Sequence, residues 1–370
     1  MFSAKQYISI WLIIVLSSLG GLAATNYYFD PLGYFGKSQG KLVVRGFDRE
    51  YKAWQIKYRQ PDVILIGNSR NFFGTDISKI TMKGSYNYSV PGNGLSYMER
   101  QLENLFYMKK PKALFLAVDI TCSNPLSKDK VKLLATDFIG DVEVYWSRIP
   151  YLLSMDTLER SIKSINSHAY YDEYGKGKFI LPPAKSKRNL LKRVEDREFK
   201  TFGEANKISE KTTICSTELL KNILTLVYDS NIPTSIIINP IHVRYMSLSY
   251  NLNPNRTNFM SMKPDLVRVN EELADKFDKT PLAIYDFRLV NKYTTEVFQF
   301  EKNIEPDYWY ESSHYNEVLG NKMIEWMLSD ENSRDASLGV VLTKDNVDQN
   351  TQKEIKALIE WNSENQFFSL

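Results

Sequence analysis

The sequence is poor in the residues that build metal sites and disulfide frameworks. Its 370 residues include two cysteines, Cys122 and Cys215, and three histidines, His168, His242 and His314. These residues are too dispersed to supply the ligand spacing of a metal site, so no metal is predicted. The cysteines can form at most one disulfide, which is possible if the chain is exported, and buried free thiols are the alternative.

An excess of charge of one sign is also missing. Lys and Arg total 47 against 44 Asp and Glu, a net charge of +3, which excludes the broad basic surface typical of nucleic-acid binding. A local basic run, KSKRNLLKRVEDREFK at 185–200, is interrupted by acids and spaces its leucines along one helical face. This pattern favours a solvated helical face, with contact to an anionic surface or partner as the alternative. Phosphate-cradling and dinucleotide-binding glycine motifs are absent after the predicted strands, so no cofactor is predicted.

One long uncharged run lies near the N-terminus. Residues 7–24, YISIWLIIVLSSLGGLAA, carry no charge, and about 20 apolar residues suffice to cross a bilayer. Because the apolar core of a signal peptide is only about 7–15 residues long, the length favours a retained transmembrane anchor at 1–25. The small residues at the end of the run leave cleavage open. Lys5 precedes the run and no positive charge follows before Lys37, which predicts a cytoplasmic N-terminus and a periplasmic or extracellular remainder.

Beyond residue 60, short apolar runs alternate with helical patterns, as is typical of parallel strands joined by crossover helices. The predicted strands are Val63–Ile66, Tyr86–Ser89, Leu114–Val118, Ser235–Ile238 and Ala283–Tyr285. The predicted helices are Ser96–Met108, Glu143–Ile165, Ser216–Tyr228, Leu266–Phe277 and Asn316–Leu328. We therefore predict an α/β fold: a three-layer α/β/α sandwich around a mostly parallel five-stranded sheet, preceded by a transmembrane helix.

The same patterns divide the chain into segments. Residues 26–59 are predicted to be a tether, 60–330 the α/β domain and 331–370 a C-terminal extension with a strand-like GVVL and a helical pattern. The stretch 119–234 between the third and fourth strands is much longer than one crossover needs. We predict an insertion around 167–211, which covers a sheet edge or forms a lid.

The carboxyl ends of the strands define where a site should lie, because ligands of open α/β sheets bind there. Ser69 follows the first strand after Gly67, an arrangement that can expose a nucleophilic hydroxyl. A serine needs a base, and His314 precedes the last helix of the α/β pattern. Glu311, three residues before it, is placed to orient the imidazole and support its protonated form, with Asp307 as the reserve.

Other polar positions near the strand ends are weaker candidates. Arg70 is interpreted either as a ligand for a substrate carboxylate or phosphate or as a structural ion-pair partner. Asp119 is either a substrate ligand or a loop-fixing acceptor. Gly92 either provides an oxyanion N–H or serves a turn that requires positive φ. His242 is either a substrate contact or a satisfied loop histidine, and the aromatic run 308–310 either stacks on sugars or packs under the last helix.

The pattern resembles the SGNH hydrolase-like superfamily, in particular its membrane-anchored branch, which includes alginate O-acetylation proteins and the D-alanyl transfer protein of teichoic acid modification. Gly67-Asn68-Ser69 matches the family's serine motif, and Glu311-Ser312-Ser313-His314 matches its acid-x-x-histidine motif. The likeness spans roughly residues 60 to 330. The sequence departs from the family in having Glu311 where aspartate is usual, and it lacks the Gly-x-Asn-Asp block after the third strand, where LAVDITCSN stands.

The resemblance implies an extracytoplasmic serine O-acyltransferase or esterase that moves an acyl group, most simply acetyl, on a cell-surface or exported glycan. Because acetyl-CoA is cytoplasmic, the resemblance also implies a multi-span membrane acyltransferase partner that relays the group. Two alternatives stay open at this point. One is a catalytically inactive glycan-binding or assembly module with the same fold, and the other is a secreted lipase-like esterase released by signal cleavage.

Overall fold

A computed structural model describes residues 3–31, 33–35, 48–80, 84–118, 148–165, 172–177, 189–199, 217–252 and 256–365. The chain separates into two compact units. The first comprises Met1–Gln60 with Lys128–Ile180, and the second comprises Pro61–Ser127 with Leu181–Leu370. Among the predicted features, Asp119, His168 and both cysteines lie outside the described residues.

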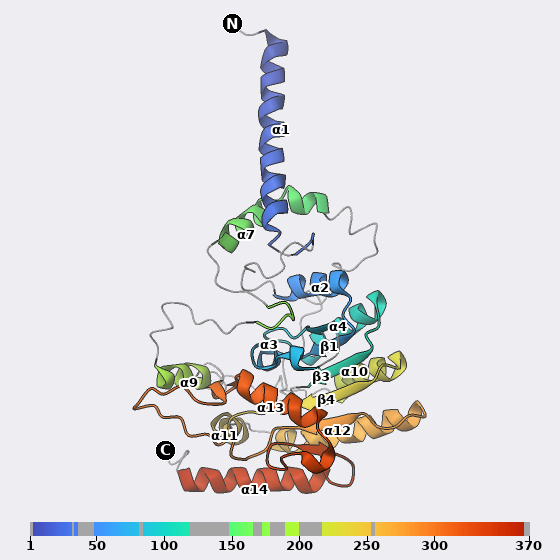
Figure 1. The fold of residues 1–370 in the computed structure, drawn as a ribbon, viewed down its shortest axis with the longest axis vertical. Coiled ribbons are helices and arrows are strands. Elements are labelled where there is room, and N and C mark those ends of the chain that lie inside the picture. The colour runs from blue at the N-terminus through green and yellow to red at the C-terminus, as the bar shows by residue number, and fades with distance from the viewer. Residues whose placement is uncertain are drawn as a thin grey trace. The chain divides into compact units, whose positions relative to one another are not determined.

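The second unit is built on a six-stranded sheet with helices on both faces (Figure 1). The strand order is β2-β1-β3-β4-β5-β8, in which the first five strands are parallel and β8 is antiparallel to β5. The strands are β1 Val63–Ile66, β2 Ser85–Asn87, β3 Ala113–Ala117, β4 Thr234–Ile238, β5 Ala283–Asp286 and β8 Val340–Leu342. Every residue of β1 is buried, as expected for a parallel strand covered on both faces.

The prediction of an α/β class with a mostly parallel sheet is confirmed, but the predicted number of five strands is wrong. The sixth strand, β8, comes from the C-terminal extension, where Val340 pairs with Asp286 and Leu342 with Ile284. Because β8 is only three residues long, its apolar pattern alone does not reveal which strand it joins.

Two groups of helices cover the sheet. The helices α4 Leu95–Met108, α10 Thr217–Ser230 and α12 Arg256–Lys276 pack in succession, and α14 Val347–Asn365 packs on α12. The helix α12 begins before the predicted Leu266 and continues through Pro264. The short α3 Ser69–Gly74 packs on α13 Glu317–Leu328. Between β5 and α13 lies a small hairpin of β6 Trp309–Glu311 and β7 His314–Tyr315.

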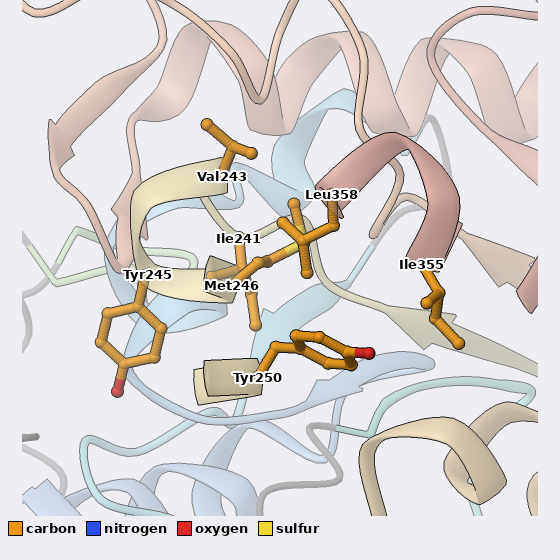
Figure 2. Packing of buried hydrophobic residues seen from close by; sticks show 7 residues of the cluster. All are labelled: Ile241, Val243, Tyr245, Met246, Tyr250, Ile355 and Leu358. Carbon is orange, nitrogen blue, oxygen red and sulfur yellow. The ribbon is translucent and has the colours of Figure 1, made fainter. Parts of the chain in front are cut away.

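The C-terminal extension is part of the packed core. Figure 2 shows its residues Ile355 and Leu358 against side chains from α11 Val243–Leu252 and the loop before it. The buried members of this cluster are Ile241, Val243, Tyr245, Met246, Tyr250, Ile355 and Leu358. Burial of this apolar surface holds α14 against the α/β unit.

A buried group of four charges also fixes α14. The Lys263 ammonium lies 2.5 Å from both the Asp286 and the Glu354 carboxylates, and the Arg288 Nε donates to Glu354 at 3.0 Å. Two positive and two negative side chains are thus buried together, so each charge has an opposite partner where water is excluded.

The first unit contains the helices α1 Ala4–Phe29, α2 Asp48–Arg59 and α7 Met155–Ile165, and residues 148–152 are also helical. The helix α1 is long and apolar enough to span a membrane, in agreement with the run noted in the sequence. Part of the predicted tether is the helix α2, whose Tyr51 and Trp54 are buried. The predicted helix Glu143–Ile165 is interrupted within its described part, because residues 153 and 154 separate helical residues 148–152 from α7.

Candidate active site

Ser69 stands at the carboxyl end of β1, at the point where the strand order reverses. The chain passes from β1 to β2 on one side and then returns to β3 on the other side. Such a switch point is where open α/β sheets bind ligands. Asn68 caps α3 by accepting a hydrogen bond from the Arg70 N–H at 2.9 Å, and Ser69 is the first residue of the helix.

A glycine is required at the exit of β1. A Cβ atom added to Gly67 would lie 2.4 Å from the Asn71 Oδ1, which is far inside van der Waals contact. The carbonyl oxygen of Gly67 accepts hydrogen bonds from the Val90 N–H at 3.2 Å and from the Asn93 Nδ2 at 2.8 Å. The loop after β2, which contains Gly92, is therefore fastened to the strand exit that carries Ser69.

The structure brings Ser69 and His314 together, as the sequence predicted. The His314 Nε2 lies 2.7 Å from the Ser69 Oγ, although the residues are 245 positions apart. The other ring nitrogen of His314, Nδ1, contacts the Glu311 Oε1. Glu311 and His314 are paired across the β6–β7 hairpin. A serine, a histidine and a carboxylate are thus linked in the order that nucleophilic catalysis requires.

The Glu311 carboxylate is held in place by more than the histidine. The Ser313 N–H donates to its Oε2 at 2.8 Å, and the Ser313 hydroxyl lies 3.3 Å from its Oε1. Arg197, from α9 Leu190–Glu198, donates from Nε to the Ser313 Oγ at 2.7 Å and lies 3.9 Å from the Glu311 Oε1. The longer side chain of glutamate is therefore accommodated by a tight turn and a neighbouring guanidinium.

The surroundings of the two side chains favour an ionised Glu311 and a neutral His314. Burial alone raises the pKa of Glu311, but His314, Arg197 and the Ser313 N–H outweigh that effect and lower it below its usual value. Burial lowers the pKa of His314, and the positive charges of Arg197 and Arg70 add to this, while Glu311 opposes it. A neutral imidazole beside the Ser69 hydroxyl is able to accept its proton at neutral pH.

Arg70 links α3 to the hairpin. It is buried, and its Nε donates to the Ser313 carbonyl at 2.8 Å. Its guanidinium also lies 5.8 Å from the centre of the Tyr245 ring. This geometry holds the helix that carries Ser69 against the turn that carries His314. A role of Arg70 in binding a substrate anion stays a prediction.

Gly92 has a φ of 71°, which favours glycine because it lies in the left-handed region. A Cβ atom there would meet nothing within 4 Å, so the backbone conformation and not crowding explains the residue. Its predicted role as an oxyanion N–H donor stays a prediction, as does the role of Asp119.

His242 has the features of the second alternative given above, a loop histidine whose hydrogen-bonding groups are satisfied. It is buried, its Nε2 lies 2.8 Å from the Glu296 carbonyl, and its Nδ1 accepts from the Arg244 N–H at 3.2 Å. Its ring stacks on Phe298. Burial lowers the pKa of His242 to about 3, so it is a neutral histidine whose two nitrogens both have partners.

Two features near the site were not found from the sequence. Asn71 and Asn239 exchange hydrogen bonds at 2.8 Å in both directions, and the Tyr315 hydroxyl donates to the Asn239 Oδ1 at 3.1 Å. This buried network joins α3, the end of β4 and the hairpin; the polar Asn239 after the fourth strand was its only signal. Arg197 was also missed, because its run was interpreted as a solvated helical face.

The remaining predictions concern aromatics and metals. In the run 308–310, Trp309 is buried and donates from Nε1 to the Tyr293 carbonyl at 2.8 Å, which agrees with packing. Phe73 is half-buried and meets the His314 ring edge to face, with centroids 6.0 Å apart.

Within the described ranges, His, Cys, Asp and Glu form no cluster that could hold a metal ion.

No family model and no curated protein matches this sequence.

Proposed function

We propose that the protein is a membrane-anchored, extracytoplasmic serine O-acyltransferase or esterase that acts on a cell-surface or exported glycan. The observation that carries the proposal is the 2.7 Å contact between the Ser69 Oγ and the His314 Nε2, with Glu311 on the other ring nitrogen. The burial that lowers the pKa of His314 supports a neutral base. The membrane location is supported by α1, and the glycan by the resemblance to the SGNH hydrolase-like superfamily.

The first half-reaction forms an acyl-enzyme. His314 takes the proton of Ser69 while the Oγ attacks the carbonyl carbon of an acyl donor, and Glu311 stabilises the imidazolium that results. The tetrahedral intermediate collapses when the bond from carbon to the leaving oxygen breaks. His314 returns its proton to that oxygen, so the released group leaves as an alcohol and the acyl group stays on Ser69.

The second half-reaction frees the serine. A sugar hydroxyl or a water molecule gives its proton to His314 and attacks the acyl carbon, and the Ser69 oxygen leaves with the proton from the imidazolium. Transfer to a sugar makes the protein a transferase, and transfer to water makes it an esterase. In the membrane-anchored family that the sequence resembles, a multi-span membrane acyltransferase supplies the donor, and we propose such a partner here.

An activated-serine probe tests the proposal. We expect a fluorophosphonate to label the full-length protein, and we expect Ser69→Ala to abolish the labelling. Ser333→Ala, which removes an exposed serine hydroxyl elsewhere in the same unit, serves as the matched control and should retain labelling. Failure of the native protein to react, combined with retained binding to a polysaccharide, would instead support the catalytically inactive binding or assembly module.

A further inference from the structure

The helix α7 has three chemically different faces. At 3.6 residues per turn, the first face consists of the small polar residues Thr157, Ser161 and Ser164, which are all buried. The second face is charged and consists of Asp156, Glu159, Arg160 and Lys163. The third face is apolar and consists of Met155, Leu158, Ile162 and Ile165. Most of this third face is uncovered, because Met155, Ile162 and Ile165 are 68%, 52% and 53% exposed.

The small face of α7 packs on the end of α1. The Ser161 hydroxyl donates to the Asn26 Oδ1 at 3.2 Å. The Nδ2 of the fully buried Asn26 donates to the Leu152 carbonyl at 2.8 Å and to the Ser154 carbonyl at 3.1 Å. Figure 1 shows α7 beside this end of α1. The contact lies just beyond the uncharged run 7–24, at the level where a helix of that length leaves a bilayer.

Apolar and aromatic exposure continues around this junction. Ile149, in the helical segment 148–152, and Leu153, in the turn that follows it, are 46% and 41% exposed. On α1 itself, Tyr27 and Tyr28 are 43% and 65% exposed. Tyrosine is enriched where membrane-spanning helices cross the boundary between lipid and water. The exposed apolar face of α7 therefore belongs to a helix that packs on the end of α1, which is itself apolar enough to contact lipid.

We propose that residues 148–165 lie on the extracytoplasmic surface of the bilayer that α1 spans, with Met155, Ile162 and Ile165 inserted between the lipid headgroups. Helices of this kind bury their apolar face by about 5–10 Å. The ion pair between Lys163 and Glu159 then lies on the aqueous side. The proposal rests on the anchoring role of α1 and is independent of the catalytic triad.

Lipid is favoured over a second copy of the chain as the occupant of this face. The polar contacts of Asn26 fix α7 to the last turn of α1, so a bilayer that holds α1 ends close to α7. A lipid contact also explains why charged residues are confined to another face of the same short helix.

Fluorescence quenching in phospholipid nanodiscs tests the proposal on the full-length chain. In a background of Cys122→Ser and Cys215→Ser, an environment-sensitive dye is attached at Ile162→Cys or, as a matched control, at Lys163→Cys. We expect a shift of emission to shorter wavelength at position 162, together with strong quenching by lipids that carry a nitroxide near the headgroup. The neighbouring position 163, on the charged face, should show neither effect.

A third label at Ile13→Cys, in the middle of α1, separates the two membrane claims. Quenching at 13 by a nitroxide deep in the acyl chains, without quenching at 162, would leave the anchor intact and overturn the proposal. Absence of quenching at 13 would overturn the anchor and the proposal together. An apolar, unquenched signal at 162 that depends on two chains sharing a disc would identify a second copy as the occupant and also overturn it.

Discussion

Glu311 and His314 face each other across a two-residue turn, and the carboxylate contacts the imidazole nitrogen that points away from Ser69. The acid-x-x-histidine spacing in the sequence corresponds to the pairing of Glu311 with His314 in the register of the hairpin. A spacing of three places the two side chains on one side of the turn, where the backbone N–H of Ser313 also reaches the carboxylate. The orientation of the base therefore depends on a local turn and not on a distant loop.

This arrangement predicts an ordered set of losses upon substitution. Glu311→Gln keeps the shape but removes the negative charge that supports the imidazolium, and we expect a roughly 10⁴-fold loss in the rate of probe labelling or ester turnover. His314→Ala removes the base itself and should cost more, on the order of 10⁶-fold. Rates measured on folded variants check this order. Equal activity of Glu311→Gln and the native protein would contradict the assigned role of the carboxylate.

The pH dependence of activity should be sensitive to the positive charge of Arg197, because this charge lowers the pKa of His314. Burial and the nearby arginines lower the pKa of His314, and only the neutral imidazole accepts a proton. Activity should therefore be lost as the pH falls through a value below the ordinary histidine pKa. Arg197→Gln removes a positive charge, so the pKa of His314 should rise and the acid limb should move to higher pH.

Two measurements give the pKa of His314. The acid limb of the kcat/KM profile gives it during turnover, and NMR titration of the His314 imidazole gives it without substrate. Arg197→Lys is the matched control, because it keeps a positive charge and should leave the limb nearer its native position. A shift of the same size in both variants would indicate lost packing instead of lost charge.

The contact between α3 and α13 should be sensitive to a single methyl group. A Cβ atom on Gly320 would lie 1.8 Å from the Gly74 carbonyl oxygen, so Gly320→Ala must push the two helices apart. We expect the free energy of unfolding to fall by roughly 1–3 kcal/mol, with a parallel loss of activity because α3 carries Ser69. Val318→Ala, at an exposed position of the same helix, should change stability little. Denaturant unfolding of both variants measures the difference.

The buried charges around Glu354 predict that the C-terminal helix is essential for stability. Glu354→Gln would leave Lys263 and Arg288 with one carboxylate between them, and breaking a buried pair costs roughly 3–5 kcal/mol. Glu360→Gln, on the same helix but in an exposed pair with Lys356, is the matched control and should have little effect. Similar unfolding curves for the two variants would show that the buried cluster contributes no more than the surface pair.

The sequence predicted the features that local patterns encode. The strands β1 and β3 are short and wholly apolar, and β4 contains an unbroken run of three isoleucines. The strand β2 has only Tyr86 between two polar residues, yet each of the five parallel strands was predicted within two residues of its observed start. Ser69, Glu311 and His314 could be singled out because a serine at a strand exit and an acid three residues before a histidine are local signals. Their meeting followed from the rule that carboxyl ends of parallel strands share one edge.

What the sequence did not predict depends on distant contacts. The pairing of β8 with β5 joins segments that no turn connects directly, and three residues carry little pattern. Arg197 belongs to a charged helix whose composition is the same whether it faces water or a carboxylate. The reciprocal pair of Asn71 and Asn239 was likewise not predicted, because a polar residue after a strand does not by itself indicate a buried partner.

The distance of 245 positions between Ser69 and His314 has a consequence for biosynthesis. A ribosome completes the serine early and the histidine late, so a nascent chain carries an ordinary, unreactive alcohol until nearly all of its length has emerged. In the proposed mechanism, Ser69 therefore has no base until the hairpin that carries His314 has been made and has packed beside α3. A product truncated before this hairpin would lack that base.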